Sequence, residues 1–259
     1  GNKYRCKNTG KYFNVKTGTL FDNSKIELRK WFMAIWLVTS HKKGISSVQL
    51  SKDIGVTQKT AWFMLERIRK CFGTENNNRL DDVVEVDETY IGGKNKNRHN
   101  SKKIKNAQGR SLKDKSAVVG MVQCQGKVNA HHVPDTKTKT LTEQIVKYVK
   151  ETAQLYTDGW LGYNKVAKMY NHDFVNHGIS EYVQGNVYTN TIEGFWAGLK
   201  RGVLGIYHSW SKKYLQDRDY VDEFVFRYNT RDYSDSERFN LLISNACIRT
   251  KYRELIYGY

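Results

Sequence analysis

Residues 83–91 read VVEVDETYI, and this stretch decides the fold class. β-Branched residues at alternate positions are typical of a strand that is buried within a sheet. The alternation puts Glu85 and Asp87 on one face of that strand and Glu88 on the other. A carboxylate inside an apolar strand is costly unless it is paired or binds a cation. Asp87 is therefore a candidate cation ligand.

The chain after this strand alternates between strand and helix patterns. Residues 117–123 and 128–133 flank a Gln-Gly turn and predict a β-hairpin. A helix is expected over residues 138–153, a short strand over 155–157, and helices from residue 191 onward. These elements describe an α/β fold.

Two short helices are expected upstream of the strand, over residues 46–54 and from Thr57 onward, with a turn at Gly55 between them. This is the layout of the helix-turn-helix motif, whose second helix enters a DNA major groove. The exposed residues at the start of the second helix would be Gln58, Lys59 and Thr60. An ordinary helical hairpin is the alternative reading, and the charge of the chain favours DNA binding.

The composition points to a polyanionic partner. The 259 residues carry 43 Lys and Arg against 26 Asp and Glu, a formal net charge of +17. Lys and Arg side chains near phosphates release the counterions condensed on a nucleic acid, which favours binding. We therefore interpret the excess as that of a nucleic-acid-binding protein, with a ribosomal-type protein or a basic surface without a specific ligand as alternatives. No apolar stretch is long enough to span a membrane. The four cysteines (Cys6, Cys71, Cys124 and Cys247) lie far apart, which suits reduced thiols in a cytosol.

A basic segment over residues 94–115 shows no periodicity. It is read as a solvated loop that could become ordered on a phosphate backbone. Its candidate DNA contacts are Lys102, Lys103 and Lys105, which we call the loop lysines.

Two further acids are candidates for chemistry. Asp158 stands where a strand meets a Gly turn, a position where open α/β sheets place their sites, although an ordinary turn aspartate is the local alternative. Glu193 lies seven residues before Lys200, so on a helix the two share a face, and Asn190 lies one turn earlier. A surface salt-bridged helix is the alternative for that pair.

The carboxylates would suit hard cations. Three carboxylates from two strands and a helix can hold two divalent ions, roughly 3.5–4 Å apart, for an in-line displacement at phosphorus. Oxygen ligands without a His/Cys cluster favour Mg²⁺ or Mn²⁺ over zinc.

Sequence blocks around these acids carry a specific resemblance. They read EVDETYIGGK at 85–94, TDGWLGY at 157–163, NTIEGFW at 190–196 and LKRG at 199–202. They resemble the signature blocks of the Merlin-related, ISXO-like insertion-sequence transposases, which are DDE-type enzymes. GIYH at 205–208 and EFVFRYNTR at 223–231 resemble the blocks that follow in that family.

The resemblance implies a domain order and roles for the site residues. It implies a remnant of a zinc-ribbon-like hairpin over 1–22, a helix-turn-helix domain over 23–75, and a ribonuclease H-like DDE catalytic domain over 76–259. Asp87 and Asp158 would be the metal-binding aspartates and Glu193 the third acid, with Asn190 a candidate partner at the third position. The expected DNA contacts near that acid are Lys200, Arg201 and His208.

The N-terminus departs from the family pattern. Relatives often carry a four-cysteine zinc ribbon, but Thr9 stands where a second cysteine would complete a CxxC pair with Cys6. A tetrahedral structural site needs four ligands, so we predict no zinc in this chain.

The expected activity is cleavage of insertion-element ends and joining of their 3′-hydroxyl ends to target DNA by two-metal-ion phosphoryl transfer. The partners would be double-stranded DNA, as terminal inverted repeats and target, and a second copy of the chain in a homodimer. The expected location is the bacterial cytoplasm, at the nucleoid, without a membrane partner. The alternatives are a ribonuclease H-like DNA nuclease or resolvase that does not join strands, and a domesticated DNA-binding regulator.

Overall fold

The computed structural model describes residues 3–92, 95, 98–105, 107, 109, 111–175, 183–184, 187–207 and 220–257. The chain divides into two compact units. The helical unit consists of Gly1–Thr74 together with Asp232–Tyr259, and the sheet unit consists of Glu75–Arg231. This division differs from the expected domain over residues 76–259, because the C-terminal segment packs with the N-terminal one.

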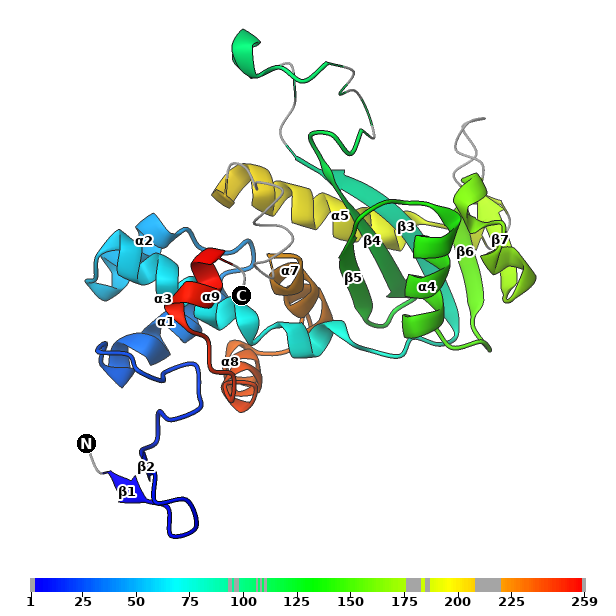
Figure 1. The fold of residues 1–259 in the computed structure, drawn as a ribbon. Helices are drawn as coiled ribbons and strands as arrows, with labels where there is room; N and C mark the ends of the chain where they lie inside the picture. Colours follow the sequence, from blue (N-terminus) through cyan, green and yellow to red (C-terminus); the bar gives the residue numbers. More distant parts are fainter. Residues whose placement is uncertain are drawn as a thin grey trace. The chain divides into compact units, whose positions relative to one another are not determined.

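A five-stranded mixed sheet forms the centre of the sheet unit (Figure 1). Its strands are β3 (Val83–Ile91), β4 (Ser116–Gln123), β5 (Val128–Val133), β6 (Gln154–Asp158) and β7 (Asn171–Val175). The spatial order is β5-β4-β3-β6-β7; β3, β4 and β5 are antiparallel, whereas β6 runs parallel to β3 and β7 parallel to β6. The α/β class and the β4–β5 hairpin predicted from the sequence are confirmed, and β3 takes the middle position.

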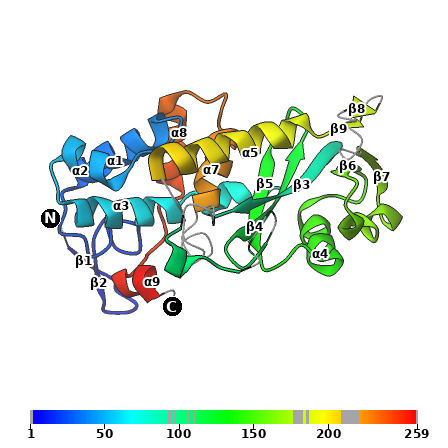
Figure 2. The same ribbon diagram turned by 90° about the horizontal axis from the view of Figure 1, so that it is seen from above.

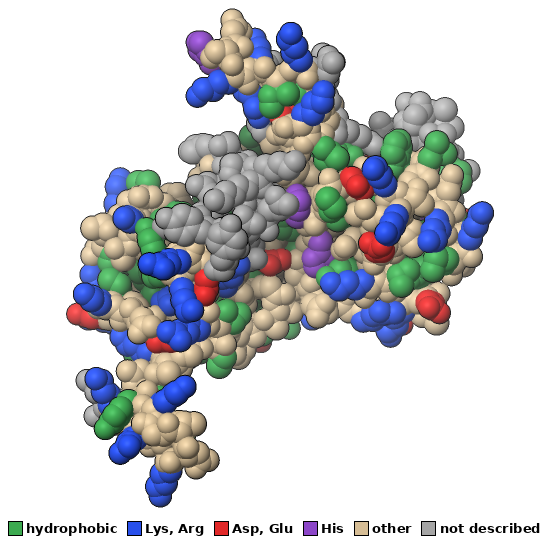
Figure 3. Space-filling view, viewed as in Figure 1, with side chains coloured by type: hydrophobic (Ala, Val, Ile, Leu, Met, Phe, Trp, Pro, Cys, Tyr) green, Lys and Arg blue, Asp and Glu red, His purple; other side chains and the backbone are tan. Residues whose placement is uncertain are grey.

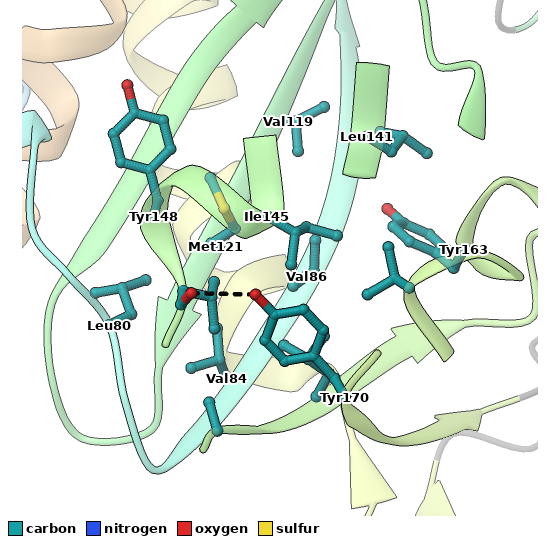
Figure 4. Close-up of a cluster of buried hydrophobic side chains, with 14 of the residues drawn as sticks. Leu80, Val84, Val86, Val119, Met121, Leu141, Ile145, Tyr148, Tyr163 and Tyr170 are labelled. Atoms are coloured by element: carbon teal, nitrogen blue, oxygen red, sulfur yellow. Dashed lines mark hydrogen bonds between the residues drawn. The ribbon is translucent and has the colours of Figure 1, made fainter. Parts of the chain in front are cut away.

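Helices cover both faces of this sheet (Figure 2). On one face α4 (Thr138–Tyr148) packs over Val84 and Val86 of β3, and Tyr170 closes this core with a hydrogen bond from its hydroxyl to the Val149 carbonyl (3.2 Å; Figure 4). On the other face lie α5 (Asn190–Gly202) and α7 (Tyr220–Asn229). Side chains alternate along β3, so the two faces receive different residues of one strand.

Short elements complete the sheet unit. They are η1 (Gly73–Asn76, which begins in the helical unit), η3 (Asn100–Lys102), η4 (Leu161–Tyr163), η5 (Val166–Lys168), β8 (Val183–Gln184), β9 (Val187–Tyr188) and the π-helical turn η7 (Val203–Tyr207). The predicted helix over 138–153 ends five residues early, at Tyr148, because residue 149 is already extended.

The helical unit contains α1 (Leu28–Ser40), α2 (Ser47–Ile54), α3 (Gln58–Lys70), α8 (Asp235–Ser244) and α9 (Tyr252–Tyr257). The Ser46 hydroxyl caps α2 by accepting the Gln49 N–H, and the Thr57 hydroxyl caps α3 by accepting the Thr60 N–H. Gly55 ends α2 in the left-handed region at φ 61°, where glycine has no steric penalty. The two helices and the turn therefore lie where the sequence predicted them.

The N-terminal hairpin is shorter than the one expected over residues 1–22. β1 (Tyr4–Arg5) pairs with β2 (Tyr12–Phe13), so the chain reverses between Arg5 and Tyr12. Leu20 is fully buried, and its N–H donates to the Ala246 carbonyl (2.9 Å). Leu20 thus helps to join the two segments of the helical unit.

The buried Arg67 of α3 provides a second junction between those segments. Its guanidinium donates to the carbonyl oxygens of Asp22 and Thr250, both at 2.8 Å. Burial lowers the pKa of this guanidinium, and its hydrogen bonds offset part of the desolvation cost. No helix in the described part of the chain is long and apolar enough to cross a membrane.

Candidate active site

Asp87 lies on the central strand β3, with its side chain on the face covered by α5. The Trp196 indole Nε1 of α5 donates a hydrogen bond to Asp87 Oδ2 (3.0 Å). Burial, followed by the negative charges of Glu88 and Asp158, raises the pKa of Asp87 from 3.8 to about 7. Ionisation of this buried carboxyl group is unfavourable without a counterion, and a bound cation would make it favourable.

Asp158 is the last residue of β6 and lies beside Asp87. The parallel register pairs Glu85 with Tyr156, and two residues further along both strands come Asp87 and Asp158, on the same face of the sheet. The effect of Asp158 on the pKa of Asp87 agrees with the placement of the two residues on neighbouring strands. Asp158 Oδ1 also accepts the Trp160 N–H (3.1 Å), which holds the carboxylate at the strand end.

Glu193 lies in the first turn of α5 and is exposed, and Asn190 is the first residue of the same helix and is also exposed. Among the described residues no three His, Cys, Asp or Glu side chains come together closely enough to hold a metal ion. The structure therefore brings together two of the three predicted acids. The charge of Asp158 beside Asp87 would favour a bound divalent cation, whereas Glu193 is not assembled with these two aspartates.

Glu88 belongs to the opposite face of the sheet, as the alternation predicted. Its Oε2 accepts the hydroxyl proton of Tyr163 (2.8 Å), and both side chains are buried. Burial and the charges of Glu88, Asp87 and Asp158 raise the pKa of this tyrosine well above its usual value. Tyr163 is thus a neutral donor that supports Glu88 from the α4 side.

The sequence did not identify how α5 is held against the sheet. Gly120 of β4 pairs with Asp87, and a Cβ atom at this glycine would lie 2.5 Å from the Trp196 ring. The absence of a side chain lets the indole lie close to the strand and reach Asp87. The sequence did contain an indication of this packing, namely Gly120 within the apolar strand of residues 117–123. An isolated glycine in a strand often marks a place where another part of the protein approaches the backbone closely.

The predicted DNA contacts lie in both units. Gln58, Lys59 and Thr60 are the first residues of α3; Gln58 and Lys59 are exposed, and Thr60 is half-buried. The loop lysines are exposed, as are Lys200 and Arg201 near the end of α5. His208 lies outside the described residues. Lys and Arg side chains outnumber acidic ones on the face shown in Figure 3.

Comparisons with known proteins give two sequence matches. A family model described as the ISXO2-like transposase domain matches residues 79–229. An uncharacterized protein in transposable element ISH50 of Halobacterium salinarum is 30% identical over 220 residues, which are 78% of this chain and 72% of that protein.

Solved structures give weaker matches. The Mos1 strand transfer complex has a TM-score of 0.30 and 11% identity, over 87% of this chain and 81% of that one. The mariner Mos1 paired end complex with Mg has a TM-score of 0.27 and 13% identity, over 92% of this chain and 84% of that one. This structural similarity is too loose to add to the two sequence matches.

Proposed function

Because the chain belongs to the ISXO2-like transposase family, we propose that it cleaves the ends of an insertion element and joins their 3′-hydroxyl ends to target DNA. The observation that carries this proposal is the pair Asp87 and Asp158, adjacent on one face of the central strands and mutually repelling. A neighbouring pair of carboxylates of this kind is what phosphoryl-transfer sites with divalent cations require. The order and directions of the five strands support a ribonuclease H-like fold for the sheet unit.

The proposed site consists of Asp87, Asp158 and Glu193, with Asn190 as a candidate partner at the third position. Divalent cations, Mg²⁺ or Mn²⁺ and two in number, would supply a nucleophile at neutral pH and stabilise the leaving oxygen when bound. Asp87 and Asp158 bind from the sheet, and Trp196 fixes the orientation of Asp87. Glu193 comes from the first turn of α5, so completing the site requires its exposed carboxylate to turn toward the aspartates when DNA and cation are present.

DNA binding is assigned to both units. We propose that α2 and α3 form a helix-turn-helix whose exposed Gln58 and Lys59, with the adjoining Thr60, read the terminal inverted repeats. The loop lysines, Lys200, Arg201 and His208 would contact phosphates without reading bases. Two element ends must be held together for joining, so the proposed active form is a homodimer on DNA.

The catalytic assignment is tested with Asp87→Asn, Asp158→Asn and Glu193→Gln. Each variant is incubated with labelled element ends and Mg²⁺, and DNA binding is measured separately by gel shift. We expect loss of strand cleavage and joining with DNA binding retained. Asp82→Asn is a matched control, because Asp82 is exposed at φ 63°, a conformation that asparagine tolerates well. Normal cleavage by any of the three variants would remove that acid from the site.

A second experiment separates the transposase from the alternatives. Pre-cleaved ends that carry a free 3′-hydroxyl are mixed with supercoiled target DNA and Mg²⁺. A strand-transfer product supports the transposase; cleavage of intact ends without such a product identifies a nuclease or resolvase. Binding without cleavage would identify a DNA-binding regulator.

A further inference from the structure

Glu85 is a fully buried carboxylate that the proposed chemistry does not use. It lies on β3 two residues before Asp87 and on the same face, and its exposed fraction is 0%. Its Oε2 accepts the backbone N–H of Ile192 (2.9 Å), the third residue of α5. The Cys124 thiol donates more weakly to the other oxygen (3.6 Å).

The contact of Glu85 with α5 replaces a missing cap. The first N–H groups of a helix have no partner within the helix, and a side chain at the preceding residue usually accepts one of them. Thr189 holds that position before α5 but makes no side-chain capping bond. Glu85 supplies the acceptor from another strand, and its negative charge suits the positive end of the helix dipole.

Two hydrogen bonds therefore tie α5 to β3. Glu85 accepts from Ile192, and Asp87 accepts from Trp196. The acceptors are two residues apart on a strand, about 6.7 Å. The donors belong to residues four apart on a helix, about one turn. Both acceptors lie on one strand and both donors belong to one helix, so a slide or rotation of α5 along β3 would lengthen both bonds.

These two hydrogen bonds also fix the position of Glu193, because Glu193 is the residue after Ile192. We propose that Glu85 is a positioning residue: by holding the Ile192 N–H it fixes where α5 presents Glu193 to the face that bears Asp87 and Asp158. This inference rests on the proposed role of Glu193. The competing possibility, that Glu85 is itself a metal ligand on the Asp87 face, predicts a different mutational pattern.

The test compares Glu85→Gln with Glu85→Leu in the full-length protein. Glutamine keeps an oxygen acceptor at nearly the same volume, whereas leucine keeps only the volume. The first readout is hydrogen exchange in the first turn of α5, measured by mass spectrometry on metal-free protein. The second is the Mn²⁺ concentration that half-saturates the protein, followed by electron paramagnetic resonance, together with the Mg²⁺ dependence of strand cleavage.

Glu85→Gln should keep slow exchange and a near-normal cation dependence. Glu85→Leu should speed exchange by about 10- to 150-fold, because a hydrogen bond to a charged group contributes about 1.5–3 kcal/mol and each 1.4 kcal/mol is about a factor of ten. It should also shift the half-saturating cation concentration by about 10- to 100-fold, the usual effect of losing a group that orients a ligand. Cys124→Ala is the matched control, since it removes the other donor to the same carboxylate, and it should leave both readouts unchanged.

Two results would overturn the inference. If Glu85→Gln loses cation binding as completely as Asp87→Asn does, Glu85 is a ligand and not a positioning residue. This conclusion needs only Glu85→Gln, which keeps the volume of the side chain, and does not require Glu85→Leu to fold. If Glu85→Leu folds and hydrogen exchange in the first turn of α5 stays slow, the hydrogen bond from the Ile192 N–H to Glu85 does not hold α5 in place. Absence of cation-dependent cleavage in the unaltered protein would instead refute the proposed function, while the exchange measurement still reports on the tie.

Discussion

Replacing Asp87 by asparagine is expected to stabilise the metal-free protein while it removes activity. The pKa of this carboxyl group is raised from 3.8 to about 7, chiefly by burial. A raised pKa means that the folded state binds the proton more tightly than the unfolded state. The contribution of the protonated Asp87 carboxyl group to the free energy of unfolding is fully present below pH 3.8 and is lost as the pH rises through about 7.

The magnitude follows from the size of that shift. Each unit of pKa corresponds to about 1.4 kcal/mol, so the ionised carboxylate destabilises the fold by at most about 4 kcal/mol above pH 7. Asp87 is only partly buried, and solvent reduces this figure; we expect about 2 kcal/mol. Asparagine carries no charge and keeps an oxygen that can accept from Trp196 Nε1. For a unit of this size the gain corresponds to about 4–8 °C in Tm.

The assay is thermal and urea unfolding of both proteins in EDTA from pH 4 to pH 8. The difference in the free energy of unfolding should be small near pH 4 and largest above pH 7. Asp82→Asn, the exposed control, should show no such pH dependence. A difference that is constant with pH, or an unaltered protein that is more stable than Asp87→Asn at pH 8, would refute the reasoning.

Three further outcomes are expected. In thermal unfolding, Mg²⁺ at 100 times its Kd should stabilise the unaltered protein by about 2.7 kcal/mol and should not stabilise Asp87→Asn. Equal stabilisation of the two proteins would mean that the ion binds elsewhere. Gly120→Ala should lower the free energy of unfolding in urea by about 1–3 kcal/mol, because its Cβ would lie 2.5 Å from the Trp196 ring; an unchanged midpoint would show that the indole can move aside. Charge reversal of the loop lysines should weaken binding to any DNA sequence and flatten the salt dependence by about 2.7 in logarithmic slope, whereas an effect on element ends alone would show base reading.

The sequence alone was sufficient to predict the central strand and the side on which each of its residues lies. Alternation along residues 83–91 separated Asp87 from Glu88, and the structure confirms this because Glu88 bonds to Tyr163 on the α4 side. This succeeds because the period of a strand depends only on local geometry. The closeness of Asp158 to Asp87, by contrast, depends on which strands are neighbours and in what register, which local patterns do not determine.

Long-range partners account for the features that the sequence did not identify. Ser24 and Glu27 match the capping-box pattern, yet the Ser24 hydroxyl accepts the Trp31 indole N–H (2.9 Å), and α1 begins only at Leu28. Glu85 reads as an ordinary strand acid until its partner, 107 residues away, is known. In both cases a tertiary hydrogen bond decides the role of a side chain that local pattern assigns differently.

The helical unit is assembled from the two ends of the chain, and this has a consequence for the time at which it matures on the ribosome. Arg67 must wait for the Thr250 carbonyl, which lies 183 residues later. At translation rates of about 5–20 residues per second this takes roughly 10–40 s. The sheet unit is continuous and its last residue, Arg231, is made 19 residues before Thr250, so the complete unit has about 1–4 s to fold before that carbonyl is made. Newly made chains are therefore expected to hold a finished sheet before the helices assigned to DNA reading are stable, and chains that terminate near residue 231 should never reach that stage.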